Sequence, residues 1–338
     1  MKVLIHFAPG PENDIFLGSR LRKNLKGAME LRRVALVDSL YAEPDICHLM
    51  SPDDEGMIKT AHEEGVPVVV SALYTELDPY ASFLETDAFG SYVLTSRAKR
   101  MLEQADVVFV PSLRAKEIVE KDLFKKPVFV VTPGVNPVRF DAIDEVGAKI
   151  FCRYERFPAN QPYALIFGSY RDKNATDFAK KMASMLPNYH LFFLGGDYGN
   201  EASPLSRWNR VSPKNLKFIP VLSDDLYRSA MKGATGLLVA ANAIPSPLSE
   251  LEALAAKTQI FRVGSVDSES SLLPEGTYLA CRTPEEAATK LLAYSPNVPE
   301  ATRMNGYRVA GENDLTHLGD IVLPLYQTLL SVKENSHD

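Results

Sequence analysis

The chain has 338 residues, of which 46% are hydrophobic and 24% charged, a composition typical of globular proteins large enough for two domains. Its formal net charge of −6 argues against a nucleic-acid-binding protein, which normally has a basic excess. The three cysteines lie far apart in the sequence, so they indicate neither a metal site nor a disulfide framework and favour a cytoplasmic location. The N-terminal run MKVLIHF predicts a β-strand rather than a signal peptide, and no apolar run is long enough to predict a membrane-spanning helix.

Apolar strands alternate with amphipathic helices in the first half of the chain. Strands are predicted over residues 2–7, 33–37, 46–49, 66–70, 107–110 and 128–131. Helices are predicted over residues 15–30, 51–64, 95–104 and 114–120, the last of them capped by Ser112. Repeated strand–helix units predict a doubly wound α/β domain.

The same alternation begins again after a looser segment between residues 139 and 162. Strands are predicted over residues 163–167, 190–194, 216–219, 236–239 and 259–263. Helices are predicted over residues 176–185, 224–231, 249–256 and 315–332, with a further helix beginning near Thr283. Two similar halves predict Rossmann-like domains over residues 1–150 and 151–315, with a ligand cleft between the facing carboxyl ends of their sheets.

Residues 234–263 are predicted to form a strand, a loop with two prolines, a helix and a second strand, which together make a βαβ unit. Ser249 is expected to cap the helix. The free N–H groups in the first turn of such a helix favour an anion, and ligands bind at the carboxyl ends of parallel strands. If the protein handles a nucleotide, this stretch is therefore where it is expected to bind.

Several segments occur in an order that is similar to one family of enzymes. They are residues 45–48 (DICH), 105–112 (ADVVFVPS), 130–140 (VVTPGVNPVRF), 168–174 (GSYRDKN), 191–196 (LFFLGG), 215–218 (NLKF) and 252–255 (EALA). The chain thereby resembles the retaining, nucleotide-sugar-dependent glycosyltransferases of the GT-B architecture in glycosyltransferase family 4 (glycosyl transferases group 1). That family includes sucrose-synthase-like and phosphatidylinositol-mannosyltransferase-like enzymes.

The resemblance implies two Rossmann-like domains that face each other across a cleft, with the acceptor on the N-terminal side and the donor on the C-terminal side. It implies that a C-terminal helix, residues 316–338, crosses back to pack on the first domain. It also implies sugar transfer with retention and without a metal, from a UDP- or GDP-linked sugar as co-substrate and with no other cofactor. The expected acceptor is a cell-surface glycan, a lipid-linked sugar or a small molecule.

The donor-site residues follow from the resemblance position by position. Lys173 takes the place of the lysine that binds the diphosphate, and Arg171 is expected to substitute for an arginine whose place Ser169 occupies. Glu252 matches the glutamate that binds the ribose. The other donor-binding candidates are Gly168, Ser169, Gly195, Pro247, Leu248 and Ser249. The alternative interpretation is that these charges belong to solvated loops and to an exposed helix face.

One departure from the family pattern concerns the donor sugar. Ile244 stands eight positions before Glu252, where the family has a glutamate that contacts the donor sugar or phosphates. Isoleucine cannot make that contact, and Pro247 lacks an N–H group. These differences keep open a catalytically impaired GT-B-like binding or partner subunit, and a GT-B sugar epimerase is a further alternative.

The candidates for the acceptor side or the cleft lie in the first half, and they are Gly10, His48, Ser71 and Tyr74. His48 also has an interpretation as a structural residue at a strand end, and His6 is similarly ambiguous. The adjacent acidic pairs 53–54 and 224–225 are expected to cap helices rather than to hold a metal.

A cluster of basic residues occurs early in the chain, at Arg20, Arg22, Lys23 and Lys26. The plain interpretation is a solvated helix face. The alternative is a contact with anionic lipid headgroups, which would place the protein at the inner face of a membrane.

Overall fold

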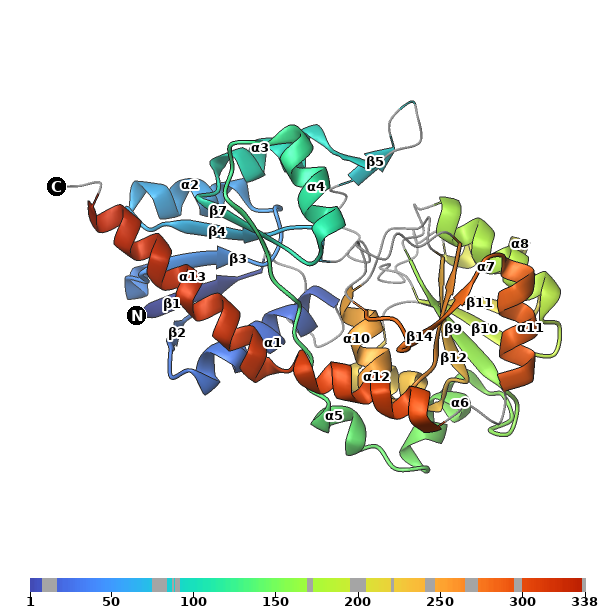
Figure 1. Ribbon diagram of the computed structural model, residues 1–338. Helices are drawn as coiled ribbons and strands as arrows, with labels where there is room; N and C mark the ends of the chain where they lie inside the picture. Colours follow the sequence, from blue (N-terminus) through green and yellow to red (C-terminus); the bar gives the residue numbers. More distant parts are fainter. Residues whose placement is uncertain are drawn as a thin grey trace.

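Two parallel sheets of six strands each organise the computed structural model of this chain (Figure 1). The structure describes residues 1–7, 17–74, 84–86, 88, 92–168, 173–194, 205–219, 222–240, 247–264, 273–294 and 300–335. The first sheet ends in the chain at Val130, and the second begins at Tyr163.

The first sheet has the strand order β2-β1-β3-β4-β7-β8. Its strands are β1 (Lys2–His6), β2 (Ala35–Val37), β3 (Ile46–Leu49), β4 (Val68–Ser71), β7 (Val107–Val110) and β8 (Val128–Val130). All of their pairings are parallel, and every residue of β3, β4 and β7 is buried. Continuous burial explains why these strands consist almost entirely of apolar residues, since a parallel sheet is covered on both faces. Strands β5 (Leu84–Thr86) and β6 (Tyr92–Leu94) form a separate antiparallel pair.

Helices cover both faces of this sheet. Helices α2 (Glu55–Glu63), α3 (Ser96–Gln104) and α4 (Leu113–Asp122) pack on one face, and α1 (Leu17–Leu31) packs on the other. The side chains of Asp54, Thr95 and Ser112 accept hydrogen bonds from the first turns of α2, α3 and α4. The predicted cap at Ser112 is thus confirmed, and Asp54 is the member of the first acidic pair that caps a helix.

The second sheet repeats this plan with the strand order β11-β10-β9-β12-β13-β14. Its strands are β9 (Tyr163–Phe167), β10 (His190–Leu194), β11 (Leu216–Ile219), β12 (Gly236–Ala240), β13 (Ile260–Val263) and β14 (Tyr278–Cys281). Helices α7 (Lys173–Met185) and α11 (Pro284–Tyr294) cover one face. The other face is covered by α6 (Ile150–Glu155), α9 (Asp224–Gly233), α10 (Pro247–Ala255) and α12 (Glu300–Glu312). The remaining elements are η1 (Leu40–Ala42), α5 (Val138–Asp141), η2 (Gly147–Lys149) and α8 (Leu205–Val211).

The predicted fold class, two doubly wound α/β units, is confirmed, and most predicted elements lie within two residues of their observed bounds. Two helices of the second half begin earlier than predicted. Helix α7 begins at Lys173 rather than at residue 176, and α10 begins at Pro247 rather than at Ser249. Proline fits the first position of a helix because its fixed φ angle is helical and its missing N–H is not needed there. The predicted cap at Ser249 is therefore wrong, because this residue lies inside the helix.

The last helix, α13 (Leu315–Asn335), leaves the second sheet and packs beside α1 on the first (Figure 1). Leu318, Val322 and Tyr326 on this helix are buried in the same core as the β1 residues Val3 and Ile5. The linker after the first sheet runs close to the start of the helix, since the Val135 N–H donates to the Asn313 carbonyl at 3.0 Å. Residues at both ends of the chain therefore share one core.

A buried histidine holds α13 against the sheet. His48, on β3, is hydrogen-bonded through Nδ1 to the Tyr326 hydroxyl at 2.5 Å and through Nε2 to the Ser71 hydroxyl at 2.8 Å. Its ring also meets the Tyr326 ring edge to face, with the centroids 5.9 Å apart. Both ring nitrogens thus have partners, which a neutral imidazole requires when it is buried.

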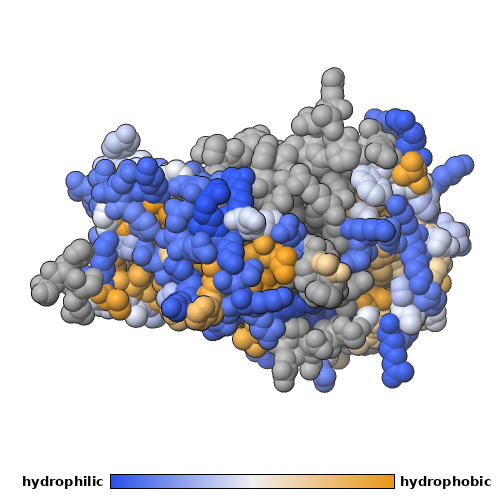
Figure 2. Space-filling view, turned by 90° about the horizontal axis from the view of Figure 1, so that it is seen from above, coloured by the Kyte–Doolittle hydropathy of each residue, from blue (hydrophilic) through white to orange (hydrophobic). Residues whose placement is uncertain are grey.

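No described helix combines the length and the apolar character that crossing a membrane would need. On the face shown in Figure 2, hydrophilic residues surround small groups of apolar ones.

We predict that His48 makes the stability of the protein depend on pH. Burial lowers the pKa of His48 to about 3 from its ordinary value of 6.5. Below about pH 6.5 the unfolded chain binds a proton that the folded chain does not, so the free energy of unfolding falls as the pH falls toward 3. The slope contributed by this one group is up to about 1.4 kcal/mol per pH unit. Urea unfolding at several values between about pH 5 and pH 7 measures it.

The His48→Gln variant is expected to lose this part of the pH dependence, although it is less stable at every pH. His317→Gln is the matched control, because His317 is exposed, and it should keep the wild-type slope. An equal slope in wild type and His48→Gln would contradict the prediction.

Candidate functional site

The first turns of α1 and α10 meet between the two sheets. Each helix follows a parallel strand, α1 after β1 and α10 after β12, so its N-terminal end lies at the carboxyl edge of its sheet. Arg20, in the first turn of α1, donates a hydrogen bond from Nε to Oε1 of Glu252 in α10 at 3.1 Å. This contact brings the carboxyl edges of the two sheets together.

Arg20, Glu252 and Tyr227 form one buried cluster. The Tyr227 hydroxyl donates to Oε2 of Glu252 at 2.6 Å, so both carboxylate oxygens accept a hydrogen bond. The guanidinium of Arg20 lies over the Tyr227 ring, 3.8 Å from the ring centroid. Arg20 and Glu252 are only 5% and 4% exposed. The interpretation of Glu252 as an exposed helix glutamate is therefore wrong.

Burial is the largest influence on the pKa values of these three groups, and the neighbouring charges add to it or oppose it. Burial alone lowers the pKa of Arg20, but Glu252, Tyr227 and Asp224 together raise it above its ordinary value. Burial raises the pKa of Glu252, while Arg20 and the hydrogen bond from Tyr227 oppose that rise. The pKa of Tyr227 lies well above 10, first because of burial and then because of Glu252. The tyrosine thus remains a hydroxyl donor.

Asp224, at the start of α9, has a different role from the one predicted. The helix is preceded by Ser223, and the Asp224 carboxylate accepts hydrogen bonds from Arg139 and, at 3.0 Å, from Nε of Arg228. Arg228 also donates to the Arg139 carbonyl at 2.8 Å. Asp224 therefore ties α5 to α9 and does not cap its helix through the side chain. Burial raises its pKa, but the two arginines lower it overall.

The start of α10 is packed tightly against the first half of the chain. Leu248 is fully buried in the core that contains β1 and α13, although it belongs to the second half. Ser249 is also fully buried, and its hydroxyl is a hydrogen-bond partner of Tyr227. Pro247 is the first residue of the helix. The predicted donor-binding residues 247–249 and 252 are therefore brought together with Arg20 and Tyr227.

Two other predicted donor residues flank the loop after β9. A side-chain carbon at Gly168 would lie 2.7 Å from Cβ of Ala175 and 2.9 Å from the Phe193 ring, so only glycine fits there. Lys173 is exposed in the first turn of α7. A lysine is unfavourable at a helix N-terminus, where the macrodipole favours anions.

The remaining predicted site residues, Gly10, Ser169, Arg171 and Gly195, lie outside the described residues, and so does Ile244, the departure from the family pattern.

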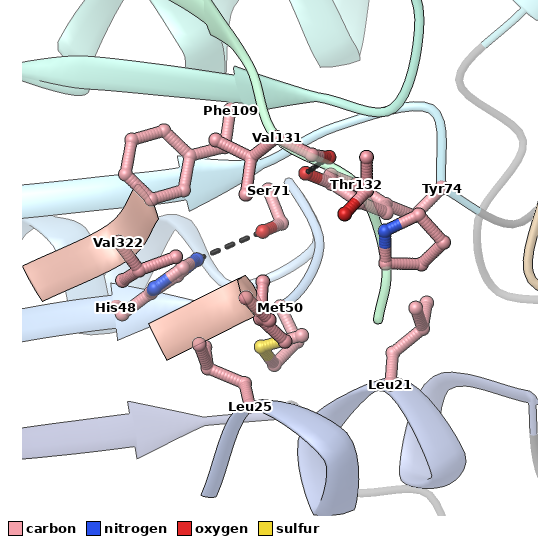
Figure 3. A pocket seen from close by; sticks show the side chains of 12 residues that line it. Leu21, Leu25, His48, Met50, Ser71, Tyr74, Phe109, Val131, Thr132 and Val322 are labelled. Carbon is pink, nitrogen blue, oxygen red and sulfur yellow. Dashed lines mark hydrogen bonds between the residues drawn. The ribbon is translucent and has the colours of Figure 1, made fainter. Parts of the chain in front are cut away.

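Three of the acceptor candidates, His48, Ser71 and Tyr74, lie on the wall of one pocket in the first half of the chain (Figure 3). The other lining residues come from α1, β7, α13 and the segments after β3 and β8, and they are Leu21, Leu25, Met50, Phe109, Val131, Thr132, Pro133, Leu318 and Val322. The volume is about 20 Å³, which is enough for one water molecule and too small for a sugar ring. The three polar groups are already engaged, since Tyr74 donates to the Val131 carbonyl at 2.5 Å.

A second polar group lies at the carboxyl edge of the first sheet. His6 ends β1, and its Nε2 lies 2.9 Å from Oδ2 of Asp54. The other oxygen of Asp54 accepts the Met57 N–H at 2.9 Å, so the helix cap fixes the carboxylate that holds the histidine. Both side chains remain partly exposed, at 18% and 28%.

Among the described residues, no group of three or more histidine, cysteine, aspartate or glutamate side chains is arranged to hold a metal ion.

The basic cluster of residues 20–26 does not form a uniform solvated face. Arg20 is buried against Glu252, and Nε of Arg22 donates to the Ile5 carbonyl at 3.2 Å. Lys26 pairs with Asp38 at 3.6 Å. The sequence could not distinguish Arg20 from its neighbours, because its partners Tyr227 and Glu252 lie more than 200 residues away. This contact is the main feature of the site that the sequence interpretation missed.

No protein-family model and no curated protein matches the sequence, but solved structures match the fold. HepE of Anabaena in complex with UDP-glucose matches with a TM-score of 0.64 and 12% identity, over 97% of this chain and 100% of that chain. Sucrose-phosphate synthase from Thermosynechococcus elongatus matches with a TM-score of 0.60 and 14% identity, over 96% of this chain and 82% of that chain. AviGT4, a glycosyltransferase involved in avilamycin A biosynthesis, matches with a TM-score of 0.57 and 14% identity, over 98% of both chains.

At such low identities the likeness establishes the fold. Both the order of the strands and the extent of these matches agree with the architecture that the sequence motifs predicted. The chain has the two-sheet GT-B fold of glycosyltransferases.

Proposed function

We propose that this protein is a glycosyltransferase that moves a sugar from a nucleotide-sugar donor to a hydroxyl group of an acceptor. The observation that carries the proposal is the match over 97% of this chain to HepE, a protein whose structure contains UDP-glucose. We infer a UDP-linked donor from the same match, with a GDP-linked donor as the alternative. The nucleotide sugar is a co-substrate, and the proposal includes no other cofactor.

The donor half of the site is proposed to surround the first turn of α10. The N–H groups of Leu248 and Ser249 belong to the first turn of a helix, where the helix macrodipole favours an anion, so they suit the diphosphate. Lys173 is proposed to add a cation, and Gly168 directly after β9 leaves no space for a side chain against Ala175 and Phe193. Glu252 is proposed to bind the ribose, which requires that a ribose hydroxyl share its carboxylate with Arg20 and Tyr227.

The acceptor half is proposed to lie at the carboxyl edge of the first sheet. The pocket around His48, Ser71 and Tyr74 is too small for a sugar, so these residues are proposed to support the acceptor site rather than to contact the acceptor. His6 and Asp54 offer partly exposed polar groups at the same edge. A glycan, a lipid-linked sugar and a small molecule all remain candidate acceptors.

Retention of configuration and independence of a metal are part of the proposal, because the family that the motifs resemble has both properties. In that chemistry cations and helix N-termini stabilise the departing diphosphate. A cytoplasmic location is proposed as well, and it fits the three buried, unpaired cysteines. Peripheral membrane contact is left only as an alternative, since Arg20 is not available to lipid headgroups.

We predict that Lys173→Ala lowers the affinity for UDP roughly tenfold or more, because a charge-assisted hydrogen bond to the diphosphate is lost. Titration calorimetry with UDP and with uridine measures the change, and the affinity for uridine should stay the same. Lys181→Ala on the same helix is the control, since Lys181 pairs with Glu285 far from the N-terminal turn. An unchanged affinity for UDP would remove Lys173 from the site.

For Glu252 we predict that the affinities for UDP and uridine fall together, unlike at Lys173. Glu252→Ala should weaken the binding of UDP and uridine by the same factor, because the ribose is common to both. Removing a buried carboxylate also destabilises the fold, so the control is Glu250→Ala. Glu250 lies on the same helix in a buried ion pair with Arg262 at 2.9 Å, and its loss should reduce stability without changing nucleotide affinity. Unchanged donor affinity in both Lys173→Ala and Glu252→Ala would contradict the assignment of a donor site.

The type of reaction is tested by its product. With a suitable acceptor, NMR of the product from an α-linked UDP-sugar should show an α-glycoside, and EDTA should leave the rate unchanged. A β-glycoside would contradict retention, and loss of activity with EDTA would contradict metal independence. A non-catalytic relative would bind none of UDP, GDP and their sugars, or would bind without turnover, whereas an epimerase would change the sugar without an acceptor.

A further inference from the structure

The proposed reaction needs positive charge beside the diphosphate, and one arginine of the first half reaches that place. When the sugar leaves its donor, negative charge develops on the nucleoside diphosphate, and cations stabilise it. Helix α10 offers N–H groups but no basic side chain of its own. Arg20 comes from α1 and reaches α10 at Glu252, in the second turn.

The described contacts of Arg20 use only part of its hydrogen-bonding capacity. A guanidinium has five N–H groups, one on Nε and four on the two Nη atoms. Nε donates to Glu252, and the flat face of the group covers the Tyr227 ring. Among the residues that the structure describes, none accepts a hydrogen bond from the Nη atoms of Arg20. This edge is the one that binds carboxylates and phosphates with two parallel hydrogen bonds.

The same contacts hold the guanidinium in place before any ligand binds. Glu252 fixes its direction, Tyr227 fixes its plane, and both partners are themselves buried. An arginine that is already ordered loses little conformational entropy when it binds an anion, so its contribution to binding is larger than that of a mobile side chain.

We propose that Arg20 is a donor-binding residue whose Nη edge contacts the diphosphate of the nucleotide sugar across the two halves of the chain. This assignment rests on the proposed function and deepens it. In the transfer step, the bond between the anomeric carbon and the diphosphate oxygen breaks, and its electron pair stays on the nucleoside diphosphate. The acceptor oxygen bonds to the anomeric carbon, and its proton passes to the diphosphate. Arg20 stabilises the charge that appears on the leaving group.

The competing interpretation is that Arg20 has only a structural role, holding the two halves together through Glu252 and Tyr227. The experiment compares UDP with uridine by titration calorimetry in wild type, in Arg20→Lys and in Arg22→Lys as the matched control. Arg22 lies on the same helix but donates to the Ile5 carbonyl of the first half. Arg20→Lys keeps the charge and loses the planar edge. We expect its affinity for UDP to fall roughly tenfold to a hundredfold, while its affinity for uridine changes less than about twofold.

Each other outcome overturns the assignment. An equal loss of affinity for UDP and uridine would show that Arg20 has only a structural role. An unchanged affinity for UDP would exclude a contact between Arg20 and the diphosphate. Tighter binding of UDP would mean that Arg20 competes with the ribose for Glu252. If wild type binds neither UDP nor GDP, the proposed function fails together with this inference, whereas normal binding in wild type confines the failure to Arg20.

A second variant covers the case in which Arg20→Lys does not fold. The double variant Arg20→Gln with Glu252→Gln removes both buried charges together, which avoids leaving one of them unpaired. The comparison is wild type, because loss of Glu252 acts on the ribose that UDP and uridine share and leaves the ratio of their affinities unchanged. The ratio of UDP affinity to uridine affinity should still fall in the double variant, and an unchanged ratio overturns the proposal.

Discussion

The contact between Arg20 and Glu252 determines how the two halves of the chain face each other. Both groups are charged and almost fully buried, so neither is stable there without the other. A pair of this kind adds little net stability, because the cost of removing two charges from water is comparable to their attraction. It does penalise arrangements that separate the partners, since each would then leave an unpaired charge in an apolar environment. The pair therefore acts mainly on the relative position of α1 and α10.

Apolar packing supplies the stability that this pair does not. Leu248 of the second half is buried in the core of the first, and α13 adds Leu318, Val322 and Tyr326 to the same core. His48 connects Tyr326 to Ser71, so the returning helix is held by hydrogen bonds as well as by packing. The two sheets thus have separate cores, but the core around β1 is completed by Leu248 and by residues of α13, which come from distant parts of the sequence.

These constraints place the chemistry at the carboxyl edges of both sheets. Helix N-termini gather there because most of the parallel strands are followed by a helix that returns to cover the sheet. The donor candidates of α10 lie at this edge, and so do Lys173 and the pair of His6 and Asp54. The polar residues that line the small pocket of the first half have another task. His48 and Ser71 bond each other, and Tyr74 donates to the Val131 carbonyl, so these three side chains are engaged within the protein rather than facing a substrate.

The sequence by itself determined the fold class and every strand of the two large sheets except β14, while the small pair β5 and β6 was missed. Buried parallel strands such as β3 and β7 are uninterrupted apolar runs, and caps such as Ser112 act over three residues, so both signals are local. The ordered motifs also identified the GT-B architecture and the importance of α10. Only the tertiary structure decided what the polar residues do. Arg20 looked like one of four similar basic residues, Glu252 was readable as an exposed glutamate and Asp224 as a cap. Each of these roles depends on a partner at least 25 and up to 232 residues away, besides the local contact of Asp224 with Arg228, and no local pattern records such a distance.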